Sequence, residues 1–532
     1  MSTSGKLLLR ISNALFKSSL NKRVPPVFTN PIKDLSINDN EKWVIWGPGK
    51  SKLIDILSNK YLCYPPLGFH WAKLNEPRIE QVQFKGVIPT AHLSARYEFY
   101  KDEFDQTCKQ FILDDSIGSN DVHYSIKTTN RDIDMKLYDK LVEQLKLNEL
   151  QDRWAMGLSN GQMRRARLAR AFLKKPDLVL VDDPFLGLDP TASSIISKFL
   201  ARSHEEIGVP VIIGLRYQDK IPNWCDNIVG VDETSGILFQ GSILTQQGKI
   251  DKLKSKAIQQ IEEHRRKLHE ANQFSVDDLI STHPFYGRNK HDIFKVPSSI
   301  EFKGVNVSYR GEPVLKDLKW DVKSGSKWHI RGDNGTGKST LLSMVIAEHP
   351  QSWNSKVIEN GQERRTGKSS YFDINKRIGM SSPELHAIFS KRTGNHTTVR
   401  ECISSGFREG SANNFIPMWD NLDQDKQKLV NIYLDYFGIQ EIADIKTFEE
   451  LTVSEEKLVL FIRALIKMPE VLILDEAFSG MEVDPMLRCH EFLESWPGTV
   501  LVVAHVASET PKCEHFIRLL GPGIYELGNV NN

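Results

Sequence analysis

The chain has 532 residues, of which 40% are apolar and 26% charged, an ordinary globular composition that excludes bulk disorder. Its formal net charge of +1 excludes a global electrostatic attraction to nucleic acid or anionic lipid. No apolar run approaches the roughly 20 residues that cross a bilayer, so we expect no membrane pathway within the chain.

The amino-terminal segment has two interpretations. Met1–Lys33 is basic, contains several serines and has no acidic residue, which is typical of a transit peptide. Leu7–Phe16 also alternates like a first β-strand. We therefore expect a mitochondrial location in which any cleavage spares this strand, with an uncleaved cytoplasmic chain as the alternative.

A first, damaged phosphate-binding pattern follows the predicted strand Lys42–Trp46. Its retained residues are Gly47, Gly49, Lys50 and Ser51. The step between its glycines is three residues shorter than in a second copy farther along the chain. Because such a loop binds phosphate through consecutive backbone N–H groups, the shortened loop is not expected to wrap phosphate in the usual way. Retention of the lysine and serine leaves weak ATP binding open.

The same copy continues with Leu158-Ser159-Asn160-Gly161-Gln162 and a basic helical segment. An apolar strand, Leu178–Asp182, then ends in two acids, Asp182 and Asp183. An apolar strand of this kind is typical of the buried centre of a parallel sheet.

A charged connector lies between the two copies. From Lys249 to Asn272 the apolar residues form a narrow helical stripe, which predicts one packed connecting helix. A partner-binding helix is the alternative. Gln273–Pro297 looks irregular, with a His-Pro pair and a charged turn.

The second copy contains a complete GxxxxGK[ST] loop after a strand that ends near Ile330. We expect a helix from Leu341. The lysine would neutralise the β- and γ-phosphate oxygens, and the serine would reach Mg²⁺. The loop consists of Gly332, Asp333, Asn334, Gly335, Thr336, Gly337, Lys338, Ser339 and Thr340.

Two acids also end a buried strand in this copy, at Val471–Glu476. Asp475 would hold Mg²⁺, directly or through water, and Glu476 would polarise a water molecule. His505 follows another apolar strand, 30 residues after Asp475. It is a candidate sensor of the γ-phosphate, with a hydrogen-bonded core histidine as the alternative.

The order Leu-Ser-x-Gly-Gln, basic helix and apolar strand ending in aspartate resembles the signature and Walker B motifs of ABC ATPases. Spacing supports a second, eroded signature at Leu451–Glu455, since 23 residues separate Thr452 from Asp475, as they separate Ser159 from Asp182. The resemblance covers both copies and is closest to twin-cassette ATPases without membrane spans. It implies an α/β fold of two tandem P-loop NTPase cassettes, each with a mainly parallel sheet, an antiparallel β part and a helical subdomain. The expected divisions are cassette 1 at 1–245, a connector at 246–297 and cassette 2 at 298–532.

In that family two cassettes stack head to tail, so the resemblance implies two composite sites. The competent site would combine the Walker motifs of cassette 2, catalytic Glu476 and His505, and Mg²⁺ ligands Ser339 and Asp475. Its remaining members would be Tyr309 and the signature residues Ser159, Asn160, Gly161 and Gln162. Tyr309 would stack on adenine, with simple core packing as the alternative, and Phe16 would be its counterpart in cassette 1.

The other composite site would combine the shortened loop, Asp182, Asp183 and the eroded signature at Thr452. Arg216 stands there in place of the histidine, and aspartate in place of glutamate. Departures from the family motifs thus affect both halves of this composite site and neither half of the competent site. The pattern predicts one hydrolytic site and one structural or regulatory site.

Two further family positions depart from the pattern. The D-loop is Gly187-Leu188-Asp189 in cassette 1 and Gly480-Met481-Glu482 in cassette 2, so only the first has the family's aspartate. Ile378–His386 lacks the Q-loop glutamine, and the first Q-loop has no clear position in the sequence.

The resemblance implies an ATPase that uses Mg²⁺ and couples cassette closure to an unknown protein partner. Two alternatives are the detached engine of a transporter, which needs a separate membrane subunit, and a ribosome-acting ABC factor. The short connector lacks the paired-helix arm of the latter group, and we expect no nucleic-acid partner. The six scattered cysteines exclude an iron–sulfur relative and are expected to be reduced, and the lack of long heptad arms excludes a chromosome-type ATPase.

Overall fold

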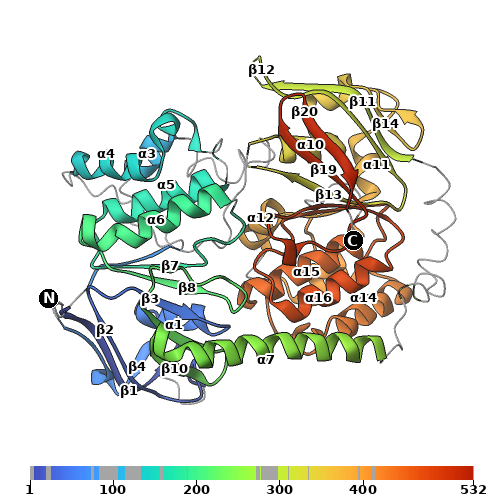
Figure 1. Cartoon of the computed structure of the whole chain (residues 1–532). Helices are drawn as coiled ribbons and strands as arrows, with labels where there is room; N and C mark the ends of the chain where they lie inside the picture. The colour runs from blue at the N-terminus through green and yellow to red at the C-terminus, as the bar shows by residue number, and fades with distance from the viewer. Residues whose placement is uncertain are drawn as a thin grey trace. The chain divides into compact units, whose positions relative to one another are not determined.

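The fold is described from a computed structural model of the whole chain (Figure 1). The described residues are 5–19, 25–72, 77–82, 106–113, 133–155, 158, 160–188, 190–270, 276, 279, 298–309, 311–333, 335–393, 396–408 and 414–530. They form two compact units, divided between Gln260 and Ile261, and we refer to these units as cassette 1 and cassette 2.

Cassette 1 contains two sheets. In the antiparallel sheet, β1 (Leu7–Lys17) pairs with β2 (Ile32–Asn38), β4 (Leu62–Tyr64) and β5 (Phe69–Trp71). The larger sheet has the order β10-β9-β3-β8-β7-β6. Its strands are β3 (Trp43–Trp46), β6 (Ile79–Val82), β7 (Leu178–Asp182), β8 (Val211–Leu215), β9 (Asn227–Asp232) and β10 (Gly236–Ser242).

The helices of cassette 1 include the two that follow the predicted motifs (Figure 1). Helix α1 starts at the shortened phosphate loop, and α5 starts within the predicted signature. The helices are α1 (Lys50–Leu57), α3 (Cys108–Leu113), α4 (Met135–Gln144), α5 (Asn160–Leu173) and α6 (Pro190–Ile207). A further helix, α7 (Ile243–Glu270), crosses the division between the two units. The predicted connector helix is thus present as α7, and it begins before the expected Lys249.

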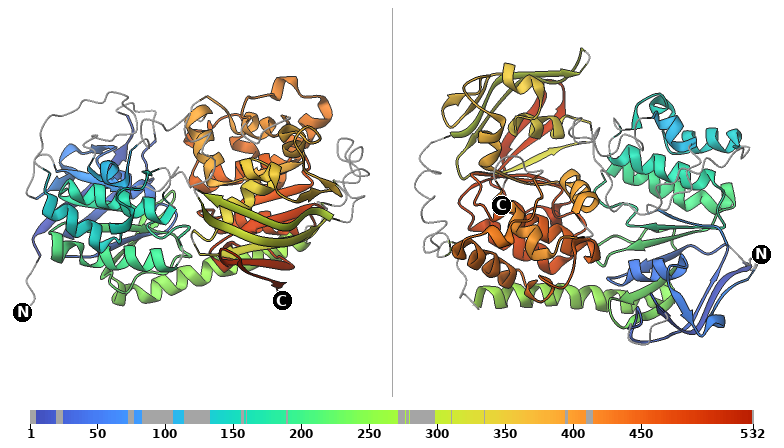
Figure 2. Two further views of the ribbon diagram at one scale, coloured as in Figure 1. Left: turned by 90° about the horizontal axis from the view of Figure 1, so that it is seen from above. Right: turned by 180° about the vertical axis from the view of Figure 1, so that it is seen from behind.

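Cassette 2 repeats this architecture, as the views in Figure 2 also show. Its antiparallel sheet contains β11 (Ser298–Tyr309), β12 (Glu312–Lys323), β14 (Val357–Glu359) and β15 (Gln362–Glu363). Its larger sheet contains β13 (Lys327–Gly332), β16 (Ile378–Ser381), β17 (Val471–Asp475), β18 (Thr499–Val503), β19 (His515–Gly521) and β20 (Ile524–Asn529). Its helices are α10 (Lys338–Val345), α11 (Tyr371–Lys376), α12 (Pro383–Thr393), α13 (Val399–Ser404), α14 (Gln424–Tyr436), α15 (Val453–Leu465) and α16 (Val483–Glu494).

The two large sheets have the same strand order. Starting from β6, the sheet of cassette 1 runs β6-β7-β8-β3-β9-β10, and that of cassette 2 runs β16-β17-β18-β13-β19-β20. Each strand of the second sheet therefore corresponds to one in the first. In each large sheet all neighbouring strands are parallel except one pair at the edge. This antiparallel pair is β9 with β10 in cassette 1 and β19 with β20 in cassette 2. Strands buried on both faces read as continuous apolar runs, which is why β7 and β17 were recognisable in the sequence. The predicted α/β fold with two tandem cassettes is confirmed.

One predicted boundary was wrong. Helix α10 begins at Lys338 rather than at Leu341. Gly337 has a φ of +101° and ends the loop in a left-handed conformation, so the helix can start at the next residue. The lysine and serine of the motif therefore belong to the first helical turn.

None of the helices in the part of the chain that the structure describes combines the length and the apolar character that a bilayer requires. The six cysteines carry no disulfide, and all except Cys63 are buried.

Candidate functional site

The phosphate loop of cassette 2 depends on glycines in left-handed conformations. Gly332, Gly335 and Gly337 have φ angles of +145°, +88° and +101°. A Cβ on Gly332 would lie 2.5 Å from the carbonyl oxygen of Leu519 and 2.6 Å from Thr336 Oγ1. A side chain at this position would therefore displace the loop from the adjacent strand, whereas glycine permits the turn.

Lys338 stands at the start of α10 and is buried. Its Nζ donates hydrogen bonds to the carbonyl oxygens of Gly332 at 2.7 Å and Asp333 at 3.0 Å. The ammonium thus lies within the curve of its own loop, next to the N-terminus of a helix. Loop N–H groups, the helix N-terminus and a lysine together form an anion site of the kind that holds phosphates.

The predicted acids and histidine of cassette 2 meet at the carboxyl ends of β17 and β18. Asp475 ends β17, and the N–H of Glu476 donates to the carbonyl oxygen of Val503 in β18 at 2.9 Å. His505 Nε2 lies 3.4 Å from Glu476 Oε1. This nitrogen is buried and makes no hydrogen bond within the described residues, so it could bind an additional acceptor.

The electrostatics of these acids favour a bound cation. Burial raises the pKa of Asp475 well above its ordinary value, and the nearby carboxylates of Glu476 and Glu384 raise it further. Lys338 and Lys457 oppose the shift. A buried carboxyl group beside other carboxylates ionises more readily when a divalent cation is present. The residues of cassette 2 therefore fit Mg²⁺ and a nucleoside triphosphate.

Glu384 was not identified as a site residue from the sequence. It lies in the first turn of α12, after the strand β16, and its side chain is buried. Ser382 Oγ donates to its carboxylate at 3.2 Å. One feature of the sequence could have indicated Glu384. It is an acidic residue in the segment that lacks the Q-loop glutamine, directly after β16, the strand that pairs with β17.

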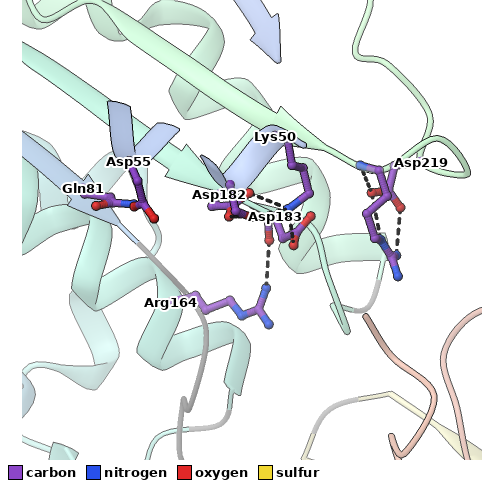
Figure 3. Close-up of polar contacts among 9 residues, drawn as sticks. Lys50, Asp55, Gln81, Arg164, Asp182, Asp183 and Asp219 are labelled. Carbon is purple, nitrogen blue, oxygen red and sulfur yellow. Dashed lines mark hydrogen bonds and ion pairs between the residues drawn. The ribbon is translucent and has the colours of Figure 1, made fainter. Parts of the chain in front are cut away.

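The corresponding site of cassette 1 is filled by its own side chains (Figure 3). Lys50 Nζ donates to Asp182 Oδ1 at 2.6 Å and to Asp183 Oδ2 at 2.8 Å. Ser51 Oγ donates to Asp182 Oδ2 at 2.6 Å. Burial lowers the pKa of Lys50, but the two carboxylates outweigh burial and hold that pKa above its ordinary value.

Arg216, at the position of the histidine, is also held by an acid. Its guanidinium donates to Asp219 from Nε at 3.1 Å and from Nη2 at 2.9 Å. Burial raises the pKa of Asp183 against the lowering effect of Lys50. Lys50 and Ser51 thus already donate to the two aspartates of cassette 1, and in this arrangement these residues do not fit a magnesium–nucleotide complex.

Several predicted site residues cannot be placed or have another role. Ser159, Asp189 and Asn334 lie outside the described residues. Tyr309 ends β11 and Asn160 starts α5, but their side chains are not described. Phe16 is 2% exposed and packs edge-on against Phe69, so the core-packing alternative holds for this counterpart of Tyr309.

The other predicted residues lie on the expected elements. Gly161 and Gln162 belong to the first turn of α5, whereas Gly47 and Gly49 flank the turn between β3 and α1. Ser339 and Thr340 follow Lys338 in the first turn of α10. The first Q-loop would follow β6, whose last residue is Val82, and the next residues are not described.

Comparison with known proteins agrees with the resemblance deduced from the motifs. A family profile described as ABC transporter matches residues 32–186 and 315–479. The chain is 60% identical to an uncharacterized ABC transporter ATP-binding protein of Saccharomyces cerevisiae, and the alignment covers 100% of both. It is 30% identical to the ABC transporter ATP-binding protein ModF of Escherichia coli over 70% of this chain and 72% of ModF. It is 24% identical to the energy-dependent translational throttle protein EttA of Haemophilus influenzae over 65% of this chain and 61% of EttA.

Proposed function

The chain belongs to the family of ABC transporter ATP-binding proteins, and from this premise we propose that it hydrolyses ATP at one competent site, built on cassette 2. The observation that carries this proposal is the different environment of the two loop lysines. Lys338 donates to carbonyls of a complete phosphate loop, whereas Lys50 is neutralised by Asp182 and Asp183.

In cassette 2 each residue has a defined chemical task. The loop N–H groups and Lys338 would bind the β- and γ-phosphates, and Ser339 and Asp475 would hold Mg²⁺. When bound, Mg²⁺ supplies positive charge that neutralises the phosphate oxygens. Glu476 accepts a hydrogen bond from the attacking water and orients it, and His505 donates to the γ-phosphate. Tyr309 is proposed to stack on adenine.

The family arrangement suggests how this site is completed. We propose that cassette 1 contributes its signature, Ser159, Asn160, Gly161 and Gln162, to the nucleotide bound by cassette 2. The first turn of α5 would then direct backbone N–H groups toward the γ-phosphate. The opposite pairing, between the self-neutralised site of cassette 1 and the eroded signature at Thr452, is proposed to be structural.

Equilibrium binding provides a direct measure of the number of sites. Glu476→Gln protein is expected to bind one ATP per chain in the presence of Mg²⁺, because the loop lysine of cassette 1 is already paired with Asp182 and Asp183. Adding Lys338→Met is expected to weaken this binding by about 10- to 100-fold through loss of a charge-assisted hydrogen bond. Isothermal titration with ATP measures both values. Two ATP molecules bound per chain would contradict the proposal.

The proposed consequence of ATP binding and hydrolysis is a cycle of cassette closure and opening that acts on a protein partner. A transporter engine would instead copurify with a separate membrane subunit. A ribosome-associated factor is the second candidate, supported by the similarity to a translational throttle protein. Cosedimentation of Glu476→Gln protein with ribosomes in ATP, compared with protein without nucleotide, distinguishes that role from action on another protein.

We further propose a mitochondrial location with β1 retained. The proposal is based on the basic, acid-free first 33 residues. Leu9, Ile11 and Phe16 of β1 are buried, and β1 pairs with β2, β4 and β5. Loss of this interior strand would expose the apolar side chains that pack against it. Amino-terminal sequencing of the protein from purified mitochondria is expected to start before Leu7. A start after Lys17, or absence from mitochondria, would contradict this prediction.

A further inference from the structure

Helix α15 (Val453–Leu465) contacts both ends of the loop that carries Glu476. Lys457 Nζ donates to the carbonyl oxygen of Glu476 at 2.7 Å. Ser454 Oγ accepts a hydrogen bond from the N–H of Glu482 at 2.8 Å. Because the helix begins at the eroded signature, the signature segment of cassette 2 contacts the Glu476 loop of the same cassette.

Glu476 has a backbone conformation that requires support. Its φ of +47° lies in the left-handed region, which is unfavourable for a residue with a Cβ. Its N–H is held by Val503, and its carbonyl oxygen also accepts from the N–H of Ser479 at 3.2 Å. The Lys457 ammonium thus adds a charge-assisted hydrogen bond to a strained residue. Such strain persists only where the surroundings determine the conformation.

Cassette 1 contains the same arrangement. Asp183 has a φ of +50°, its N–H donates to Gly214, and its carbonyl oxygen accepts from the N–H of Leu186 at 3.2 Å. Arg164 Nη1 donates to the same carbonyl oxygen at 3.4 Å, as Figure 3 shows. Arg164 and Lys457 each stand five positions after the first polar residue of their signature. The basic residue was thus retained in cassette 2 although the motif before it was lost.

The substitutions that erode the second signature also create contacts. Ser454 occupies the position of Gly161 in cassette 1, and only the serine has a hydroxyl group that can accept from Glu482. Thr452 and Glu455 form a capping box at the start of α15. This box satisfies backbone N–H groups that would otherwise be available to an anion at the helix N-terminus.

We propose that Lys457 is a positioning residue for ATP hydrolysis, and that the eroded signature of cassette 2 braces the loop from Glu476 to Glu482. The proposal rests on the proposed function, since it assigns Glu476 to the activation of water. In this role α15 holds the backbone of Glu476 so that its carboxylate points toward the reacting water, and Lys457 does not itself touch ATP.

Steady-state ATPase kinetics test this role. Lys457→Met is expected to lower kcat by about 10- to 100-fold, because a displacement of the carboxylate of about 1 Å has an effect of that order. KM and the dissociation constant for ATP are expected to change by less than about twofold, since the lysine does not reach the nucleotide. Lys457→Arg retains a donor and is expected to restore kcat to within about threefold of the wild type.

Lys446→Met is the matched control. Lys446 Nζ pairs with Glu455 of α15 at 3.0 Å, at the start of this helix rather than at the loop of Glu476. The same change of residue type is therefore expected to leave kcat unchanged.

Three outcomes would overturn the inference. These are wild-type kcat in Lys457→Met, a loss of kcat that Lys457→Arg does not relieve, and a loss matched by weaker ATP binding. If Lys457→Met does not fold, Ser454→Ala decides, with a several-fold lower kcat at unchanged ATP affinity expected and a wild-type kcat contradicting it. Glu476→Gln in the same assay separates the proposals, because activity that survives that change refutes the proposed function itself.

Discussion

Glu476→Gln is expected to lower kcat for ATP hydrolysis by about 10²- to 10⁴-fold, the usual contribution of a positioned general base. The amide retains the size of the carboxylate but cannot accept a proton from water. Glu476 follows the carboxyl end of β17, and the neighbouring His505 is assigned to the γ-phosphate rather than to the water. Steady-state phosphate release at fixed Mg²⁺ and salt measures the effect.

Asp183→Asn is the matched control for Glu476→Gln. Asp183 follows β7 as Glu476 follows β17, but its carboxylate is bound to Lys50. We expect this variant to retain the wild-type kcat. Comparable losses in both variants would show that the assigned asymmetry is wrong. Loss in Glu476→Gln alone would also provide an ATP-bound form for the capture of partners.

Lys50→Met is expected to unfold cassette 1 at a lower temperature, by an amount on the order of 10 °C. Lys50 is buried, and its removal leaves the buried carboxylate of Asp182 and the half-buried carboxylate of Asp183 without their shared cation. Breaking a buried ion pair by removal of one partner costs roughly 3–5 kcal/mol. Differential scanning calorimetry of the nucleotide-free protein measures the transition.

Lys338→Met provides the comparison in cassette 2. Lys338 donates to the uncharged carbonyl oxygens of its own loop, at 2.7 Å and 3.0 Å. The melting temperature of the nucleotide-free protein should therefore change less than in Lys50→Met. Combining Lys50→Met with Asp182→Asn should recover part of the loss, because one of the two buried charges is removed as well. Equal melting temperatures for Lys50→Met and wild type would refute the structural role of Lys50.

The tandem cassettes could be recognised from the sequence because their motifs are local. A phosphate loop needs glycines where φ is positive, and Gly332, Gly335 and Gly337 have such φ angles. A buried parallel strand needs an unbroken apolar run, which identified β7 and β17 and the acids at their ends. These requirements act over a few residues, so one sequence was sufficient to reveal them.

The chemical state of each site depended on contacts between distant segments. The sequence left weak ATP binding to cassette 1 open, since Lys50 and Ser51 were retained. Only the tertiary structure showed that Lys50 pairs with carboxylates more than 130 positions away. This ion pair requires helix α1 and the end of strand β7 to meet, and no local pattern specifies which partner a long side chain selects.

The same reason explains the contacts of α15. The sequence predicted Leu451–Glu455 as an eroded motif, an interpretation that considered only what the segment had lost. Folding places Ser454 and Lys457 against the loop from Glu476 to Glu482, where a hydroxyl and an ammonium satisfy backbone groups of that loop. The sequence by itself determined which elements form and where the reactive groups lie along the chain. The tertiary structure decided which charges neutralise one another, because hydrogen bonds and ion pairs depend on distances that separation along the chain does not specify.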